Sequence, residues 1–288
     1  MLTRIITGVI GAVIAVGLIS VGGPLFAAAI VLLGCIAWWE FAQMMKKKGY
    51  AAYISSGIGT LLLVALAGLG YYVEMESVYI MAFTTMLTAL FCIFIPIEGL
   101  FRHCQRGEAN WAANTALSLF ALLYCGLLMS HVIDLRGFDY GPHMKLGFKV
   151  FDYGEICLWT ALLGTWASDT FAYFVGRAFG KTPFCSVSPK KSFEGAVGGF
   201  VGCFIVVLAL GELGLEQPLW QNVLLALAIA FFAPVGDLIE SILKRSFDIK
   251  DSGKLFPGHG GVLDRFDSLL FTAPVTYYLL LIFSVFKL

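Results

Sequence analysis

Long apolar stretches recur along this chain and constrain its fold more than any other feature of the sequence. An α-helix needs about 20 apolar residues to cross the ~30 Å hydrocarbon core of a bilayer. The chain is 59% hydrophobic and only 13% charged, whereas a soluble domain is about 25% charged. We therefore predict an all-α, polytopic integral membrane protein with about nine transmembrane helices. The predicted spans are 5–22, 24–45, 51–73, 77–97, 112–133, 155–179, 194–212, 219–243 and 267–286.

The positions of Lys and Arg predict the orientation of these helices, because cytoplasmic loops carry an excess of both residues. With nine spans, fifteen of the 19 Lys and Arg residues fall on the side of the N-terminus and four on the other. We therefore expect the N-terminus inside and the C-terminus outside. Trp38, Trp39 and Glu40, followed by the lysines at 46–48, are interpreted as an aromatic belt with a cytoplasmic anchor, without chemistry.

Net charge and cysteine usage narrow the classes of function. The formal net charge is 0, so bulk charge gives no reason to expect nucleic-acid binding. The seven cysteines form no C-x-x-C pair and lie mostly in apolar runs. We interpret them as small buried hydrophobic residues.

A charged stretch near the C-terminus stands out against this apolar background. If the run before it is a helix, one face near the helix end carries Asp237, Glu240, Ser241 and Lys244, at i, i+3, i+4 and i+7. Asp264, Asp267 and Ser268 repeat the i, i+3 and i+4 spacing where the next apolar run begins. We expect both groups of carboxylates at the same membrane surface.

The loop between these two helix ends contains His259, Gly260 and Gly261. Glycines allow backbone conformations that aim successive N–H groups at one point, which suits an anion. Mg²⁺ binds carboxylate oxygens together with the phosphate oxygens of a substrate. Carboxylates, cations and a glycine turn therefore indicate a site for magnesium and phosphate.

A second group of polar residues surrounds the start of the seventh span. Asp169 lies inside an apolar helix, where a lone charge is costly. Lys190 and Lys191 precede Ser192, a plausible helix N-cap, and cations beside a helix N-terminus suit phosphate. Two alternatives stay open: Asp169 could belong to a helix contact face, and the two lysines could only mark the cytoplasmic boundary.

Both charged stretches resemble one known family, the phosphatidate cytidylyltransferases, also called CDP-diacylglycerol synthases. The first similar run is Ser241-x-x-Lys244-Arg245-x4-Lys250-Asp251-x-Gly253-x3-Pro257-x-His259-Gly260-Gly261-x2-Asp264-Arg265-x-Asp267. The second runs from Ser168-Asp169-Thr170 through Gly176-Arg177 and Gly180-Lys181 to Ser188-Pro189-Lys190-Lys191-Ser192-x-Glu194-Gly195. The N-terminal half of the chain is similar to the family only in its apolar character.

The resemblance implies that CTP and phosphatidic acid react to give CDP-diacylglycerol and pyrophosphate. A phosphate monoester has a second pKa near ~6, so the lipid phosphate is already an anionic nucleophile at neutral pH. No catalytic base is therefore expected; charge neutralisation and in-line placement are what the reaction needs.

Roles for individual residues follow from that reaction. Asp237 and Asp264 are expected to hold the Mg²⁺ that bridges the CTP phosphates, with Asp267 assisting directly or through a second cation. The glycine loop is expected to receive the leaving pyrophosphate. The predicted catalytic residues are Asp237, Asp264, Asp267, Lys244, Arg245 and His259. The predicted substrate-binding residues are Lys190, Lys191, Ser188, Ser192, Ser241, Lys250, Asp251, Gly260, Gly261, Arg265 and Asp169.

The organisation of the chain is predicted from the same features. Residues 1–288 are expected to form one membrane domain, in which 1–133 supply mainly scaffold and lipid-facing helices and 155–288 supply catalytic helices and cytoplasmic loops. The resemblance implies a homodimer in a bacterial inner membrane, with CTP, phosphatidic acid and the bilayer as partners. Two alternatives stay open: a secondary transporter of an anionic solute, and a related cytidylyltransferase or kinase acting on an isoprenoid lipid.

Overall fold

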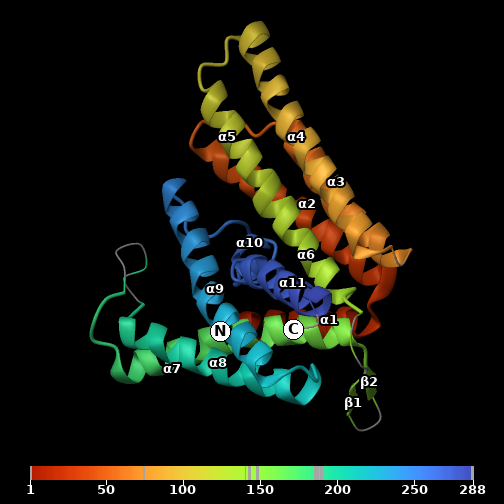
Figure 1. Ribbon diagram of the computed structural model, residues 1–288. Coiled ribbons are helices and arrows are strands. Elements are labelled where there is room, and N and C mark those ends of the chain that lie inside the picture. The colour runs from red at the N-terminus through yellow and green to blue at the C-terminus, as the bar shows by residue number, and fades with distance from the viewer. Residues whose placement is uncertain are drawn as a thin grey trace. The chain divides into compact units, whose positions relative to one another are not determined.

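The computed structural model describes residues 2–73, 75–139, 141, 144–146, 149–184, 188 and 191–286. Its backbone is almost entirely helical (Figure 1), which confirms the predicted all-α class. The packing divides the chain into two compact units. Unit 1 comprises Met1–Asp134 and Ser246–Arg265, and unit 2 comprises Leu135–Arg245 and Phe266–Leu288. The charged stretch 237–267 is therefore divided between the two units.

Unit 1 is built from the N-terminal helices and one segment of the charged stretch. Helix α3 packs against α2, α4 and η1, a short π-helical segment inside a longer helical rod. The rod continues from α5 through η1 into α6, whose last two residues belong to unit 2. The helices are α1 (Leu2–Val21), α2 (Gly23–Lys47), α3 (Ile54–Tyr72), α4 (Ser77–Arg106), α5 (Trp111–Ala121), η1 (Leu122–Leu127), α6 (Leu128–Arg136) and the short α10 (Leu263–Phe266).

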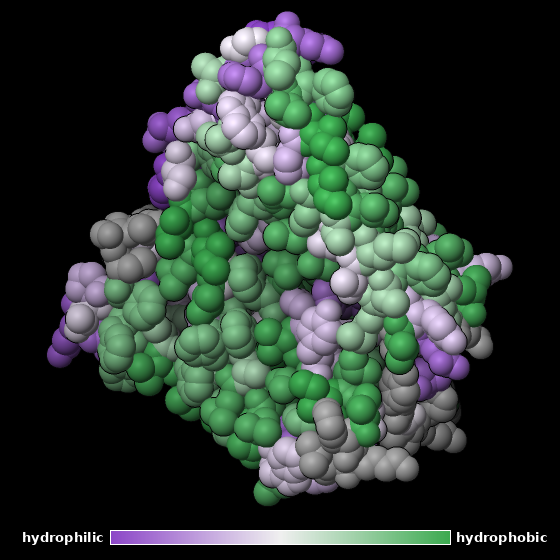
Figure 2. Space-filling view, turned by 45° about the horizontal axis from the view of Figure 1, so that its top comes forward, coloured by the Kyte–Doolittle hydropathy of each residue, from purple (hydrophilic) through white to green (hydrophobic). Residues whose placement is uncertain are grey.

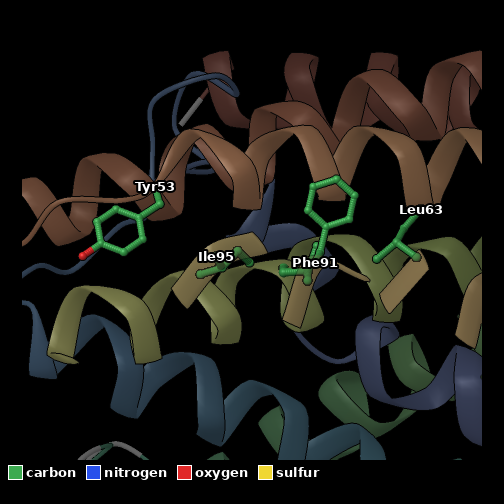
Figure 3. Close-up of a cluster of buried hydrophobic side chains, with 5 residues drawn as sticks. Tyr53, Leu63, Phe91 and Ile95 are labelled. Atoms are coloured by element: carbon green, nitrogen blue, oxygen red, sulfur yellow. The ribbon is translucent and has the colours of Figure 1, made fainter. Parts of the chain in front are cut away.

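A cluster of buried hydrophobic side chains holds α3, α4 and η1 together (Figure 3). Gly59 of α3 allows this approach, because a Cβ at that position would lie only 2.8 Å from the ring of Phe91. Interiors are packed as densely as organic crystals, so such an overlap would force the helices apart. The cluster consists of Tyr53, Leu63, Phe91, Ile95 and Leu122.

The start of α3 is capped by a side chain from another helix. The side chain of its own N-cap residue, Tyr53, makes no capping hydrogen bond. Instead Glu98 of α4 accepts hydrogen bonds from the backbone N–H groups of Ile54 (3.2 Å) and Ser55 (2.9 Å). Arg102 donates to the same carboxylate at 2.6 Å. A carboxylate thus satisfies N–H groups that lack an acceptor within the helix.

Unit 2 contains a small hairpin and the later helices. Helices α7 and α8 run side by side (Figure 1). Small residues of α8 permit the contact, since a Cβ at Gly199 would lie 2.7 Å from the carbonyl oxygen of Ser168. Helix α11 also packs on α7, where the hydroxyls of Thr165 and Thr272 are 3.2 Å apart. The elements are β1 (Met144–Leu146), β2 (Lys149–Phe151), α7 (Tyr153–Phe179), α8 (Phe193–Gly214), α9 (Leu219–Ser246) and α11 (Leu269–Phe286).

Each of the nine predicted spans overlaps a helix of the described chain. Among the described residues, six segments are long and apolar enough to cross a membrane: α2, α3, α4, the α5–η1–α6 rod, α8 and α9. Helices α1 and α11 are apolar but shorter, over Ile6–Val21 and Leu269–Val285. Much of the surface in Figure 2 is hydrophobic, as lipid-facing helices require. A membrane protein is thereby supported, while the count of nine crossings stays a prediction.

Candidate active site

The end of α9 carries the first half of the predicted site, within unit 2. Asp237 forms an ion pair with Lys191, which comes from the segment just before α8. Ser241, one turn later, lies 3.4 Å from the other oxygen of the Asp237 carboxylate. Lys244 pairs with Glu240 on its own helix. The structure therefore brings the second charged block to Asp237, as the hypothesis for Lys191 required.

Asp267 belongs to the same unit and lies in the turn between α10 and α11. Gly236 of α9 permits the approach, because a Cβ there would lie 2.6 Å from the carbonyl oxygen of Asp267. Burial, and then the nearby Asp237 carboxylate, raise the pKa of Asp267 to about 7, and Asp169 adds a weaker repulsion. Acidic groups that repel one another inside a protein favour a cation between them.

The start of α8 fixes the segment that presents Lys191. Ser192 is the N-cap predicted from the sequence, and its Oγ accepts a hydrogen bond from the backbone N–H of Gly195 at 3.1 Å. The Glu194 carboxylate accepts hydrogen bonds from the N–H of Lys181 (3.1 Å) and the hydroxyl of Thr182 (2.9 Å). These bonds join residues 181–182, directly after α7, to the first turn of α8, which begins two residues after Lys191.

Other residues of the second block have less direct positions. The carbonyl oxygen of Ser188 accepts a hydrogen bond from the N–H of Lys191 at 3.0 Å, so Ser188 supports the lysine through its backbone. Lys190 lies outside the described residues. Asp169 is exposed on α7, whereas Gly176 packs against Ser192. The predicted polar face of α7 is therefore divided between an exposed part and a helix contact.

Asp264 occupies a different environment, in unit 1. It is buried, and its Oδ2 accepts three hydrogen bonds. The donors are the N–H of Ser252 (2.8 Å), the hydroxyl of Ser252 (2.9 Å) and the N–H of Gly261 (2.8 Å). Gly261 was expected to direct its N–H toward pyrophosphate, and here that N–H is directed to Asp264. In this structure the glycine turn therefore supplies a hydrogen-bond donor to the Asp264 carboxylate.

Glu40 of α2 completes the same network. Its Oε1 accepts from the N–H of Val262 (3.0 Å), and its Oε2 accepts from the N–H of Leu263 (3.1 Å) and the hydroxyl of Ser252 (3.1 Å). Only 1% of Glu40 is exposed. The N-terminal half therefore contributes a buried carboxylate to the loop that carries Asp264.

The remaining predicted residues lie around this loop. His259 Nδ1 is 2.9 Å from the hydroxyl of Thr7 on α1, and the carbonyl oxygen of His259 accepts from Arg265 Nε at 3.0 Å. Gly260 has a φ of +85°, which favours glycine, and a Cβ there would overlap the Asp264 carboxylate. Arg245, Lys250 and Asp251 are exposed, and their roles stay predictions.

Comparison with known proteins decides which family this arrangement belongs to. A sequence model of the cytidylyltransferase family matches residues 2–283. The chain belongs to the cytidylyltransferase family. A phosphatidate cytidylyltransferase of Synechocystis sp. is 35% identical, with 96% of this chain and 94% of that protein aligned. One from Bacillus subtilis is 32% identical, with 98% of each chain aligned. Phosphatidate cytidylyltransferase 5, chloroplastic, of Arabidopsis thaliana is 30% identical over 91% of this chain and 67% of that protein.

These matches confirm the resemblance drawn from the two charged blocks, and they extend it to the apolar half. For a cytidylyltransferase, Glu40 is the residue that the sequence interpretation missed. It was grouped with Trp38 and Trp39 as part of an aromatic belt. One signal in the sequence could have identified it: Glu40 is a carboxylate inside an apolar run, where a charge is costly. The same reasoning was applied to Asp169.

The donor chemistry of this cytidylyltransferase fits Mg²⁺, although three shared ligands are not evident. Among the described residues, no three His, Cys, Asp or Glu side chains gather as a metal-binding group. Mg²⁺ commonly needs only one or two carboxylates, with substrate phosphates and water completing its shell. Asp237 and Asp267 in unit 2 are such a pair, because the Asp237 carboxylate lies near enough to disfavour the charge of Asp267. The metal assignment therefore stays a prediction.

Proposed function

We propose that this chain transfers the cytidylyl group of CTP to phosphatidic acid, giving CDP-diacylglycerol and pyrophosphate. The observation that carries the proposal is the similarity to proteins named phosphatidate cytidylyltransferase over nearly the whole chain, at 35% and 32% identity. The apolar helices agree with a substrate that resides in a membrane.

In this reaction an oxygen of the lipid phosphate attacks the α-phosphorus of CTP. The bond from that phosphorus to the β-phosphate oxygen breaks, and pyrophosphate leaves with the electron pair. Both reactants are anions, so the protein must neutralise charge and align the two phosphates. Lys191, Lys244 and Arg245 are the cations that we assign to this task.

The ion pair of Lys191 with Asp237 suggests how the site responds to substrate. Asp237 pairs with Lys191 at the end of α9. A bound phosphate offers the lysine a stronger charged acceptor, and the lysine can then turn to it without leaving the site. Asp237 becomes available to a cation in the same step.

We propose that Asp237, Asp264 and Asp267 hold Mg²⁺. When bound, the ion supplies positive charge to the CTP phosphates and stabilises the charge that develops on the leaving group. The Lys191 pairing and the raised pKa of Asp267 support a cation at the end of α9. The assignment of Asp264 to the metal is supported by its spacing from Asp267 in the charged stretch of the sequence.

We further propose that the site faces the cytoplasm of a bacterial cell, with the protein in the inner membrane. The N-terminus would then lie inside and the C-terminus outside, as the excess of Lys and Arg on one side predicts. A homodimer is the assembly that the family resemblance implies.

The test is direct incubation of the detergent-purified protein with labelled CTP, Mg²⁺ and phosphatidic acid. We expect a labelled lipid that migrates as CDP-diacylglycerol, together with one equivalent of pyrophosphate. Parallel reactions with diacylglycerol and with an isoprenoid phosphate define the acceptor. Label on the isoprenoid lipid alone, or release of phosphate without labelled lipid, would refute the proposal.

A further inference from the structure

We propose that Glu40 is a positioning residue for the proposed reaction. From helix α2 it holds the segment 252–264, here called the Asp264 loop, in the geometry that orients the Asp264 carboxylate. The kinetic part of this inference rests on the proposed function, whereas the structural part does not.

The first support is the set of groups that Glu40 satisfies. The N–H groups of Val262 and Leu263 lie at the start of α10, where a helix has no internal acceptors for its first turn. Each of these groups donates to a different oxygen of Glu40. Both oxygens are therefore engaged, and the plane of the carboxylate is fixed relative to the loop.

The second support is the connection between Glu40 and Asp264 through Ser252. The Ser252 hydroxyl lies 3.1 Å from Glu40 Oε2 and 2.9 Å from Asp264 Oδ2. A hydroxyl has one proton, so it donates to one of the two carboxylates at a time. The backbone N–H of Ser252 donates to Asp264 as well. A change at Glu40 is therefore transmitted to Asp264 across a single side chain.

The third support is the steric fit of the loop around Glu40. A Cβ at Gly253 or at Gly261 would overlap the carboxylate of Glu40. The loop backbone therefore approaches the carboxylate more closely than any residue with a side chain could allow. Glutamine has nearly the same shape, but it replaces one acceptor oxygen by an NH₂ group that would face a backbone donor.

Other contacts hold the loop region to the N-terminal helices, so loss of Glu40 alone should leave the protein folded. Lys48, near the end of α2, pairs with Asp248. The ring of Phe41 packs edge-on against Phe247, with centroids 5.9 Å apart. These contacts lie before residue 252, so they hold the entry to the Asp264 loop without contacting Asp264.

Glu98 offers a matched control for a purely structural role. It too is a carboxylate of unit 1 that accepts two backbone N–H groups at the start of a helix. Its backbone partners belong to α3 and its side-chain partner Arg102 belongs to α4, so they include no residue of the Asp264 loop. If Glu40 only stabilised the fold, Glu40→Gln and Glu98→Gln would have the same consequences for the reaction.

The first experiment measures hydrogen exchange of the purified protein without metal or substrate. In Glu40→Gln we expect the amides of 252 and 261–263 to exchange at least tenfold faster, while those of α7 keep their wild-type rates. Glu98→Gln should accelerate exchange only near 54–55. Wild-type exchange of the loop in Glu40→Gln would overturn the proposal.

The second experiment measures turnover and its dependence on Mg²⁺. We expect Glu40→Gln to lower kcat at least tenfold and to raise the half-activating Mg²⁺ concentration, with the KM for phosphatidic acid within twofold of wild type. Glu98→Gln should leave all three within twofold. Equal losses in both variants, or an unchanged Mg²⁺ requirement in Glu40→Gln, would reduce Glu40 to a structural residue and refute the proposal.

Two safeguards keep the outcomes separate. If Glu40→Gln fails to insert, Ser252→Ala removes only the shared hydroxyl, and it should also raise the Mg²⁺ requirement; a wild-type requirement would overturn the proposal. If the wild-type protein makes no CDP-diacylglycerol but Glu40→Gln still releases the loop, the proposed function fails and the positioning contact stands. If the wild-type protein makes CDP-diacylglycerol but Glu40→Gln leaves the loop unaltered, the proposed function stands and the positioning contact fails.

Discussion

The two parts of the charged stretch hold their carboxylates in opposite ways. At the end of α9, Asp237 faces a side-chain cation, Lys191. In the Asp264 loop, Asp264 faces backbone N–H groups and a hydroxyl. A side-chain ion pair can exchange its partner for a phosphate or a metal ion, whereas backbone donors are fixed by the fold. We therefore expect the end of α9, with Asp237 and Lys191, to respond to substrate, and the Asp264 loop to keep its structure.

Removal of metal should have the largest effect on turnover, and it should affect the two parts of the charged stretch differently. EDTA is expected to abolish turnover, because cations of the chain alone do not neutralise a triphosphate, and Mg²⁺ should restore it. Hydrogen exchange of the Asp264 loop should not change in EDTA, because its donors are part of the protein. Full turnover in metal-free buffer would contradict the metal assignment, and a loosened loop would contradict the comparison.

Replacing the carboxylate of Asp237 or of Asp264 should have the next largest effect on turnover. Asp237→Ala and Asp264→Ala are each expected to lower turnover about 10²-fold. Only Asp264→Ala should also destabilise the fold, by about 1–3 kcal/mol, since it leaves buried N–H donors without an acceptor. Turnover and thermal unfolding in detergent measure the two effects. Asp248→Ala, at a highly exposed carboxylate near the same loop, is the control and should stay within twofold of wild type.

Lys191→Ala tests the responsive part directly. The loss of one phosphate contact should cost about 1.5–3 kcal/mol, the range for a charged hydrogen bond, or roughly one to two decades in kcat/KM. The unfolding temperature should change little, because Asp237 is partly exposed. Lys254→Ala removes an exposed cation outside the predicted site and serves as the control. Kinetics of Lys191→Ala within twofold of wild type would make this lysine a boundary residue only.

Ser192→Ala should have a smaller effect, on stability more than on chemistry. Loss of an N-cap costs about 1 kcal/mol, and here the cap holds the backbone next to Lys191. We expect a lower unfolding temperature and a severalfold higher KM for CTP. Ser192→Asp restores a capping acceptor and should recover stability. An Asp variant as unstable as the Ala variant would show that the hydroxyl does not act as a cap.

Lys48→Ala should have the smallest effect. Its ion pair with Asp248 is largely exposed, and exposed pairs contribute about 0–1 kcal/mol. We expect thermal unfolding and turnover close to wild type, which would leave the Asp264 loop dependent on Glu40. A loss of turnover as large as that of Glu40→Gln would show that the Lys48–Asp248 pair anchors the Asp264 loop as strongly as Glu40 does, which would contradict this expectation.

The sequence predicts well whatever depends on local pattern. Apolar length predicts the helices, and Ser192 is recognisable as an N-cap because capping involves residues three apart. Helix α4 contains Pro96 and continues beyond the predicted end of the fourth span at 97, to Arg106. A proline inside a membrane helix is tolerated when neighbouring groups satisfy the backbone.

The parts of the site that escaped prediction depend on contacts between distant residues. Glu40 meets residues more than 200 positions later in the chain, and no periodicity connects them. The sequence placed Asp237, Ser241 and Lys244 on one helix face, but it could not decide whether Lys244 would choose Asp237 or Glu240. In the structure Lys191, from another segment, pairs with Asp237, and Lys244 pairs with Glu240.

The return of the chain from unit 2 to unit 1 has a consequence for biosynthesis. Glu40 leaves the ribosome early and enters the membrane with α2, yet its partners at 252–263 are translated more than 200 residues later. A buried carboxylate without hydrogen-bond partners is costly. Nascent chains that stop before residue 252 therefore lack the three groups that donate hydrogen bonds to the Glu40 carboxylate in the complete fold.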